Sequence, residues 1–173
     1  RVESSAASDV YKRQELNIFQ ELNMLPAPFD GLFLSMNVTK TDGKSSLDVD
    51  NGTVSFPFRK LAEDVSNISI GYDKNKFDIR LSAVSRSPYL DYLADDDSET
   101  IQEDLDNNNI RYTDDHTQID FNLKYKINKN LSLKFDLNNI TDEPEFYYWG
   151  TPDRLSQYDE YGTTASIGLR YTY

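Results

Sequence analysis

Residues 119–138 read IDFNLKYKINKNLSLKFDLN, and this stretch decides the fold. Apolar residues occupy every second position on both sides of the turn-forming residues 128–130. Polar and charged residues fill the positions between them, among them Asp120, Lys124 and Asp136. Alternation with a period of two is typical of a β-strand that has one apolar and one polar face. The stretch therefore predicts two antiparallel strands joined by a tight turn.

The same alternation continues through most of the chain after Gln14. Residues 164–173 alternate as regularly as the stretch above, and weaker copies occur upstream. By this criterion the chain holds about seven strands, and no stretch shows the apolar stripe of a helix. The weaker copies are Glu15–Met24, Leu32–Val38, Ile68–Tyr72 and Phe77–Leu81.

Short and long connections alternate between these strands. The tight turns are 26–31, 73–76 and 128–130, and the long polar segments are Gly43–Glu63, Ser87–Arg111 and Thr141–Glu160. Because consecutive antiparallel strands reverse direction, we expect every long segment on one side of the sheet and every tight turn on the other. This is the layout of a bacterial outer-membrane barrel, with short periplasmic turns and long extracellular loops. The predicted fold class is all-β, an antiparallel transmembrane β-barrel fragment with up-and-down strands.

Composition limits the function classes. The chain has 173 residues, no cysteine and a formal net charge of −12, and 38% of its residues are hydrophobic. This length fits one domain, and the acidic balance argues against nucleic acid, whose phosphates are bound by Lys and Arg. No window approaches the roughly 18 consecutive apolar residues of a transmembrane helix. Barrel strands put only every second residue into lipid, so a barrel stays possible.

The first fourteen residues, RVESSAASDVYKRQ, do not share the pattern of the rest. Residues Asp9–Gln14 back-translate to GATGTGTATAAGAGACAG, which is identified as the transposon mosaic end used to prepare sequencing libraries. We therefore interpret residues 1–14 as a translated adapter joined to a metagenomic fragment, and expect them to be disordered. A natural N-terminal tail is the alternative. The barrel strands are expected in residues 15–173.

Several short motifs resemble the C-terminal end of TonB-dependent receptors. They are NNITDEP at 138–144, YDEYG at 158–162 and IGLRY at 167–171. The stretch LPAPFDGL at 25–32 is similar to a turn found in a branch of this family often tied to uptake of carbohydrates or complex substrates. The resemblance covers roughly Glu15 to Tyr173. The chain departs from it at Thr163, where the family usually has arginine, and in ending on tyrosine rather than phenylalanine.

The resemblance implies a function and a location. Members of the family form a barrel of about 22 strands around an N-terminal plug domain, so we expect this chain to be its last third, without the plug, the TonB box or a signal peptide. The expected function is import of a bulky ligand, such as a siderophore or a carbohydrate, across the outer membrane of a Gram-negative-type bacterium. The expected partners are outer-membrane lipid, the TonB energy-transducing complex and the barrel-assembly machinery, which would read Tyr171 and Tyr173.

One ligand-binding cluster is predicted in the last long connection. Tyr147, Tyr148, Trp149 and Arg154 offer aromatic rings and a cation that stack on a sugar or a siderophore ring. Aromatic anchoring at a membrane interface is the alternative reading of these rings. No catalytic residues are predicted, because His116 is the only histidine and no nucleophile motif or phosphate loop is present. We therefore expect the protein not to be an enzyme.

No metal or cofactor is predicted either. The acidic run Asp95–Asp106 has the carboxylates that Ca²⁺ prefers, but such runs are usually solvated surface. Residues 48–52 resemble a calcium loop, yet Gly52 comes one place early and Arg59 stands where a bidentate Glu is required. Asn51 and Gly52 are better explained as a type I′ hairpin turn.

Two other functions stay open at this point. A passive porin would share the barrel but lack the plug domain. A soluble β-sandwich that acts as a binding module would share the alternation but would need no detergent, because its apolar residues face an internal core.

Overall fold

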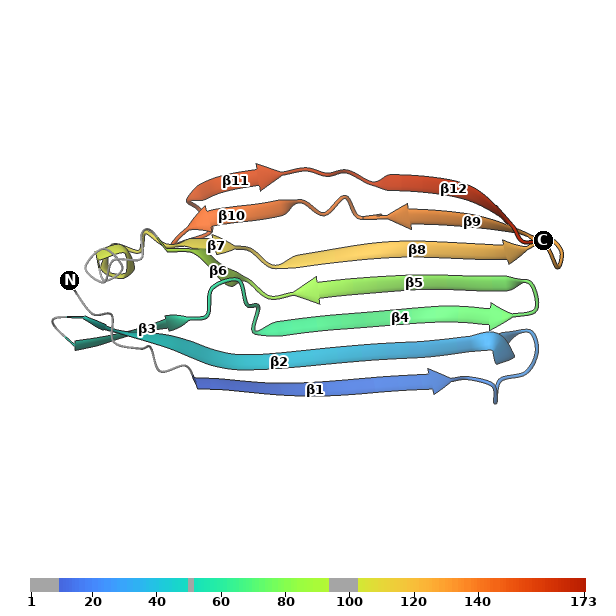
Figure 1. Cartoon of the computed structure of the whole chain (residues 1–173), viewed down its shortest axis with the longest axis horizontal. Helices are drawn as coiled ribbons and strands as arrows, with labels where there is room; N and C mark the ends of the chain where they lie inside the picture. The colour runs from blue at the N-terminus through green and yellow to red at the C-terminus, as the bar shows by residue number, and fades with distance from the viewer. Residues whose placement is uncertain (1–9, 50–51, 94–102) are drawn as a thin grey trace.

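Eight strands of the described residues form one long antiparallel sheet, and seven of them follow one continuous path. The computed structural model describes residues 10–49, 52–93 and 103–173, and within these the main sheet runs in the order β1-β2-β4-β5-β8-β9-β12, with β3 paired to β2 (Figure 1). The number of strands along this path agrees with the predicted seven. The strands are β1 (Val10–Glu21), β2 (Leu32–Val49), β3 (Gly52–Pro57), β4 (Asp64–Lys74), β5 (Phe77–Arg86), β8 (His116–Lys126), β9 (Leu131–Asn138) and β12 (Thr164–Tyr171).

The tight turns and the long connections lie at opposite ends of this sheet, as predicted. The 3-10 turn η1 (Phe29–Gly31) precedes β2 at the turn end, and the β4–β5 and β8–β9 turns lie beside it (Figure 1). The three long connections lie at the other end, which we call the loop end. Every pairing between neighbouring strands is antiparallel. The sheet is therefore an up-and-down meander.

The apolar face of this sheet is open. Side chains in the middle of its strands are largely accessible: Ile68 is 49% exposed and Ile167 is 76% exposed. A sandwich would cover such a face with a second sheet, and no such layer exists in the part of the chain that the structure describes. The open apolar face therefore favours the prediction that these residues face lipid, and it argues against the β-sandwich alternative, in which they would face a protein core.

The composition of the apolar face changes at both of its ends. At the turn end it carries rings, including the cross-strand pair Phe77 and Tyr125, whose centroids are 4.9 Å apart. At the loop end it changes to hydroxyls, and Ser85 shares a hydrogen bond of 2.8 Å with its cross-strand partner Thr117. Aromatic residues at one boundary and polar ones at the other are typical of a lipid-facing band.

A second, smaller sheet continues the first beyond the loop end. Its order is β11-β10-β7-β6, and each strand follows or precedes the corresponding strand of the main sheet along the chain. These strands are β6 (Tyr89–Tyr92), β7 (Arg111–Thr113), β10 (Glu145–Trp149) and β11 (Leu155–Asp159). The sequence predicted irregular polar loops here. The correction has a physical reason, because strands of 3 to 5 residues are too short to show an alternation that can be counted.

A small core stabilises this extension. Leu90, Leu93 and Ile110 are buried together, with Phe56, Leu105 and Tyr112 packed against them. Residues 103–106 form one helical turn. No helix in the described ranges is long and apolar enough to cross a membrane.

The predicted boundary at residue 15 needs a correction. Strand β1 begins at Val10, and Val10–Gln14 pair with Lys44–Lys40 of β2. Main-chain hydrogen bonds do not depend on side-chain identity, so a chain that continues alongside an 18-residue strand can extend the ladder whatever its origin. Residues 1–9 lie outside the described residues, and the adapter origin of residues 1–14 stays a prediction.

A β2–β3 hairpin is present where a turn was predicted, but Asn51 and Gly52 are not its two turn residues, because Gly52 belongs to β3. Gly52 pairs with Val49 of β2, and residues 50 and 51 lie between them in the sequence. These two residues lie outside the described ones. Gly52 has a φ of 137°, which favours glycine.

A candidate ligand-binding site at the loop end

The seam between the two sheets brings functional side chains together. Four breaks separate the strands of the main sheet from those of the small sheet. They are residues 87–88 between β5 and β6, 114–115 between β7 and β8, 139–144 between β9 and β10, and 160–163 between β11 and β12, and they lie side by side (Figure 1). Prolines at 88 and 144 have no N–H to donate to a ladder. The breaks change the direction of the chain, and side chains at the ends of β5, β7, β8 and β10 therefore come close to one another.

Asn139 holds the seam in place. Its side chain donates to the carbonyl oxygen of Glu143 at 3.0 Å and accepts from the Glu143 N–H at 2.9 Å. Its own N–H donates to Asp120 Oδ1 at 2.9 Å, and its carbonyl oxygen accepts from Thr163 Oγ1 at 2.8 Å. Its φ of 53° is one that asparagine tolerates better than most residues. The NNITDEP motif is therefore a structural tie in this chain.

Arg86 is the centre of the first polar group at the seam. Its Nη2 donates to Glu145 Oε2 at 2.5 Å, and its Nη1 donates to the carbonyl oxygen of Asp114 at 2.8 Å. Its guanidinium carbon lies 5.1 Å from the centre of the Tyr89 ring. His116, its cross-strand partner, places Nδ1 3.2 Å from the carbonyl oxygen of Pro144. His116 opens β8 as a polar residue, and its ring contacts this group.

Arg111 forms a second group of the same kind. Its Nε donates to Asp91 Oδ2 at 2.7 Å, and Nη2 donates to the same oxygen. Its guanidinium carbon lies 5.3 Å from the centre of the Tyr147 ring. An arginine held by a carboxylate and stacked on a tyrosine is therefore present twice, once on each side of the seam. Because each cation is already paired with a carboxylate, neither group carries an excess of positive charge.

These two groups share the polar face of the protein. Arg86 lies on the polar face of β5 and contacts Glu145, and β10 alternates so that Tyr147 and Trp149 lie on the same side as Glu145. Burial, followed by the nearby negative charge of Glu145, raises the pKa of Tyr147 above its ordinary value of 10.0. Its hydroxyl therefore stays protonated near neutral pH, and can donate a hydrogen bond.

Tyr148 does not belong to the site, which corrects one prediction. Its ring is stacked on Tyr112 with centroids 5.6 Å apart and an interplanar angle of 24°, on the opposite face of β10. Only 8% of Tyr148 is exposed. The sequence suggested a cluster of three neighbouring aromatic residues in a loop. In a strand, neighbouring side chains point to opposite faces, so the middle ring turns away from its two neighbours.

Trp149 and Arg154 close the turn between β10 and β11. The Trp149 N–H donates to the carbonyl oxygen of Arg154 at 2.9 Å. The Arg154 guanidinium donates from Nη1 to the carbonyl oxygen of Asn108 at 3.0 Å and otherwise stays exposed. Tyr147, Trp149 and Arg154 thus remain candidates for contact with a ligand.

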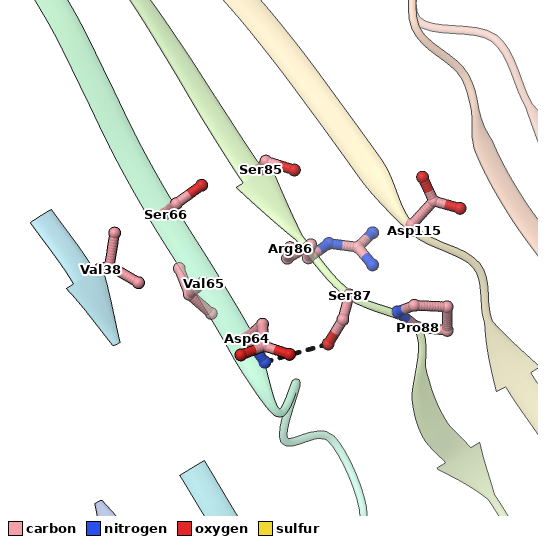
Figure 2. Close-up of a pocket in the computed structure, with 9 residues that line it drawn as sticks. All are labelled: Val38, Asp64, Val65, Ser66, Ser85, Arg86, Ser87, Pro88 and Asp115. Carbon is pink, nitrogen blue, oxygen red and sulfur yellow. Dashed lines mark hydrogen bonds between the residues drawn. The ribbon is translucent and has the colours of Figure 1, made fainter. Parts of the chain in front are cut away.

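A hollow of about 330 Å³ lies at the ends of β4 and β5 beside this site. Figure 2 shows Arg86 reaching from the end of β5 towards Asp115, with Ser85 beside it on β5 and Ser66 on the neighbouring strand β4. The Asp64 N–H donates to Ser87 Oγ at 3.1 Å, which joins the two strand ends. Its lining combines hydroxyls and charges with Val38, Val65 and Pro88, and Ser85 belongs to the apolar face, so the hollow is not assigned to the ligand site.

The other predicted residues are placed as follows. Tyr171 is the last residue of β12 and is 66% exposed on its apolar face, and Tyr173 lies beyond the strand end. Most of the acidic run, residues 95–102, lies outside the described residues. Within the described ranges no group of three His, Asp or Glu side chains is placed to hold a metal ion.

Comparisons with known proteins add the architecture of a larger molecule. No family model and no curated protein matches the chain. Among solved structures, the chain is similar to the siderophore receptor PiuA from Acinetobacter baumannii, with a TM-score of 0.65 and 14% identity. The match covers 96% of this chain and 22% of that receptor.

The chain has the fold of one strip of a receptor barrel. It spans less than a quarter of the length of that receptor, since the match covers 22% of the receptor chain. An open strip explains the two edges of the main sheet: β1 and β12 each have one partner in the described residues, and they do not pair with each other. The seam and its two arginine groups lie at the loop end of this strip.

Proposed function

We propose that this chain is part of a TonB-dependent receptor that imports a bulky ligand across the outer membrane. The observation that carries the proposal is a seven-stranded meander whose apolar face is exposed on β1, β2, β4, β5 and β12 and half-exposed on β8 and β9. Such a face favours contact with lipid over water, because the exposed apolar area of a water-soluble protein is limited to scattered residues and small patches. The fold likeness to a siderophore receptor supports the same assignment.

The site at the loop end supports a binding function. Tyr147 and Trp149 offer ring faces on the polar side, and the two arginine–carboxylate groups beside them offer fixed hydrogen-bonding partners. We infer that this surface contacts the ligand before import, on the outer side of the membrane. The ligand class is a siderophore, a carbohydrate or a similarly bulky polar molecule. The role is transport, and no catalytic step is assigned to the chain.

The partners follow from this role. Lipid of the outer membrane would contact the apolar face. The TonB complex would supply energy through a part of the receptor outside this chain. The barrel-assembly machinery would read the C-terminal strand, with Tyr171 and Tyr173.

Refolding into lipid vesicles tests the proposal in the complete receptor. Leu133→Arg places a charge on the apolar face and should cost about 2–4 kcal/mol of folding free energy near the bilayer midplane. Lys134→Leu, one residue along on the polar face, is the matched control and should cost far less. Equal costs for the two variants would reject the lipid-facing assignment. Binding of the purified periplasmic domain of TonB to the complete receptor tests the energy-coupled role, and no binding would favour a passive barrel.

A further inference from the structure

The apolar face of the main sheet changes to polar side chains within one row at its loop end. The last apolar row of β4, β5 and β8 is Ile68, Ala83 and Ile119, and the next row on the same face is Ser66, Ser85 and Thr117. Two residues along a strand span about 7 Å, which matches the roughly 5–8 Å of one headgroup layer of a bilayer. If the apolar row contacts lipid tails, the hydroxyl row therefore lies at the depth of the lipid headgroups.

The hollow of about 330 Å³ at the ends of β4 and β5 borders this hydroxyl row (Figure 2). Ser66 and Ser85 line it from the hydroxyl row, and Val38, the cross-strand partner of Ser66 on β2, lines it from the same face. The hollow lies where the strands end, so Val65 and Arg86 of the polar face also border it. Its size is at the lower end of the roughly 300–1,000 Å³ of small-molecule sites, and suits a single headgroup.

Two polar groups at this hollow are available to a ligand. Among the residues that the structure describes, the Ser66 hydroxyl and the Asp115 carboxylate have no hydrogen-bond or ion-pair partner. The rim beside them is fixed, because Asp64 and Ser87 exchange two hydrogen bonds. The Asp64 N–H donates to Ser87 Oγ at 3.1 Å, and the Ser87 N–H donates to the Asp64 carbonyl oxygen at 2.9 Å. A fixed rim lowers the entropic cost of binding.

The charges around the hollow favour a neutral ligand. Arg86, the cation that lines it, already donates to Glu145 Oε2 at 2.5 Å. Lys40 lies 3.6 Å from Asp64 and is offset by that carboxylate. Asp115 therefore leaves an excess of negative charge, which repels phosphate. Within the described ranges no group of three carboxylate or imidazole side chains is placed to hold a bridging metal ion.

A sugar ring has the complementary chemistry. Its O–H groups donate strong hydrogen bonds to a carboxylate and exchange weaker ones with a serine hydroxyl. Its C–H faces pack on apolar side chains, which Val38, Val65 and Pro88 supply. The apolar row one step along the strands, where Ile68 is 49% exposed, offers a place for acyl chains attached to that sugar.

We propose that this hollow binds the uncharged sugar headgroup of an outer-leaflet glycolipid through Ser66 and Asp115. The proposal rests on the lipid-facing assignment of the sheet. It is independent of the imported ligand and of the loop-end site, because the hollow borders the apolar face.

Native mass spectrometry of the complete receptor in a sugar-free detergent tests this site, with galactosyl diacylglycerol as the probe. The double variant Ser66→Val/Asp115→Ala removes both unpaired polar groups and should weaken binding about tenfold or more. Asp78 and Ser82, on the polar face of β5, provide the matched control: Asp78→Ala/Ser82→Val should bind like the wild type. Asp115→Ala alone changes an exposed position, so it should fold normally and still weaken binding about threefold or more.

Equal affinity of the wild type and the Ser66/Asp115 double variant would overturn the proposal, and so would an equal loss in the control variant. Free galactose that displaces the lipid at the same concentration would assign the hollow to a soluble sugar instead. Phosphatidylglycerol bound as tightly, with the same dependence on Asp115, would replace the sugar with a phosphate. If the probe does not bind while Leu133→Arg remains costlier than Lys134→Leu in vesicles, the glycolipid site alone is rejected. Equal costs of those two variants would reject the lipid-facing assignment as well.

Discussion

The ring of Phe33 on β2 lies over Gly71 on β4, its direct cross-strand partner. A Cβ placed on Gly71 would fall 2.1 Å from Phe33 Cζ, so no larger residue fits there without movement. Arg80, the next partner along the ladder, has its guanidinium carbon 5.4 Å from the centre of the same ring. One aromatic side chain therefore spans three strands on the polar face, and only 8% of it is exposed.

Gly71→Ala should therefore lower the free energy of unfolding of the complete protein in lipid vesicles by about 1–3 kcal/mol, the usual cost of overpacking. Gly168→Ala is the control, since its Cβ meets open space, and its effect should stay within about 0.5 kcal/mol. Adding Phe33→Leu to Gly71→Ala should recover part of the loss. Similar losses for both glycine variants in urea unfolding would show that the ring contact is not the cause.

Asn139 should be sensitive in a specific order of substitutions. Asn139→Ala removes two side-chain hydrogen bonds and places alanine at a positive φ, which together should cost about 2–3 kcal/mol. Asn139→Gly removes the same bonds but accepts the backbone conformation, so it should cost about 1 kcal/mol less. Amide hydrogen exchange at Glu143 should accelerate in both variants. A glycine variant less stable than the alanine variant would contradict this account of the seam.

The ion pair between Arg86 and Glu145 is expected to couple more strongly than an exposed pair. Both side chains are mostly shielded, with 21% and 23% of their surface exposed. A double-mutant cycle with Arg86→Met and Glu145→Gln should give a coupling energy of about 0.5–3 kcal/mol. Lys40 and Asp64, 3.6 Å apart and more than half exposed, serve as the comparison and should give below about 0.5 kcal/mol. Equal coupling in the two cycles would mean that the seam does not shield its charges.

Strand prediction from this sequence succeeded where alternation was long. Residues 119–138 show enough repeats to define both strands, and the parity of turns and loops fixed their directions. It failed at β10, because both faces of that strand carry rings: Tyr148 packs on Tyr112, while Tyr147 lies under Arg111. Glu145–Trp149 therefore shows no alternation of polar and apolar residues, and its aromatic residues were interpreted as one cluster in a loop.

The two arginine groups had no signal in the sequence. Arg86 and Glu145 are 59 positions apart, and Arg111 and Asp91 are 20 apart. Only the strand register brings each pair together, and that register depends on breaks in four strands. The cross-strand pair Lys124 and Lys134, by contrast, could be inferred from the sequence. A tight turn joins the two alternating strands that carry these lysines, and the turn sets them opposite each other.

Removal of Tyr171–Tyr173 from the complete receptor should abolish assembly in the outer membrane. The deletion takes away the last outward-facing ring of β12 and the Thr172 contacts that tie this strand to the β8–β9 turn. Deletion within the part of the acidic run before residue 103 is the comparison, because it spares Leu105 of the small core, and it should leave assembly intact. Heat-modifiable mobility on a gel distinguishes folded from unfolded receptor. Normal folded receptor without the last three residues would mean that the C-terminal strand is a dispensable end.

Oxygen accessibility along β9 tests the lipid-facing sheet most directly. The chain has no cysteine, so single cysteines at residues 131–138 of the complete receptor can carry a nitroxide label without background. In bilayers, labels at Leu131, Leu133, Phe135 and Leu137 should be relaxed by oxygen, which concentrates in lipid. Labels at the four alternating positions should respond to a water-soluble nickel complex instead. A strand that shows no period of two, or whose leucine positions respond to the nickel complex, would contradict a lipid-facing barrel wall.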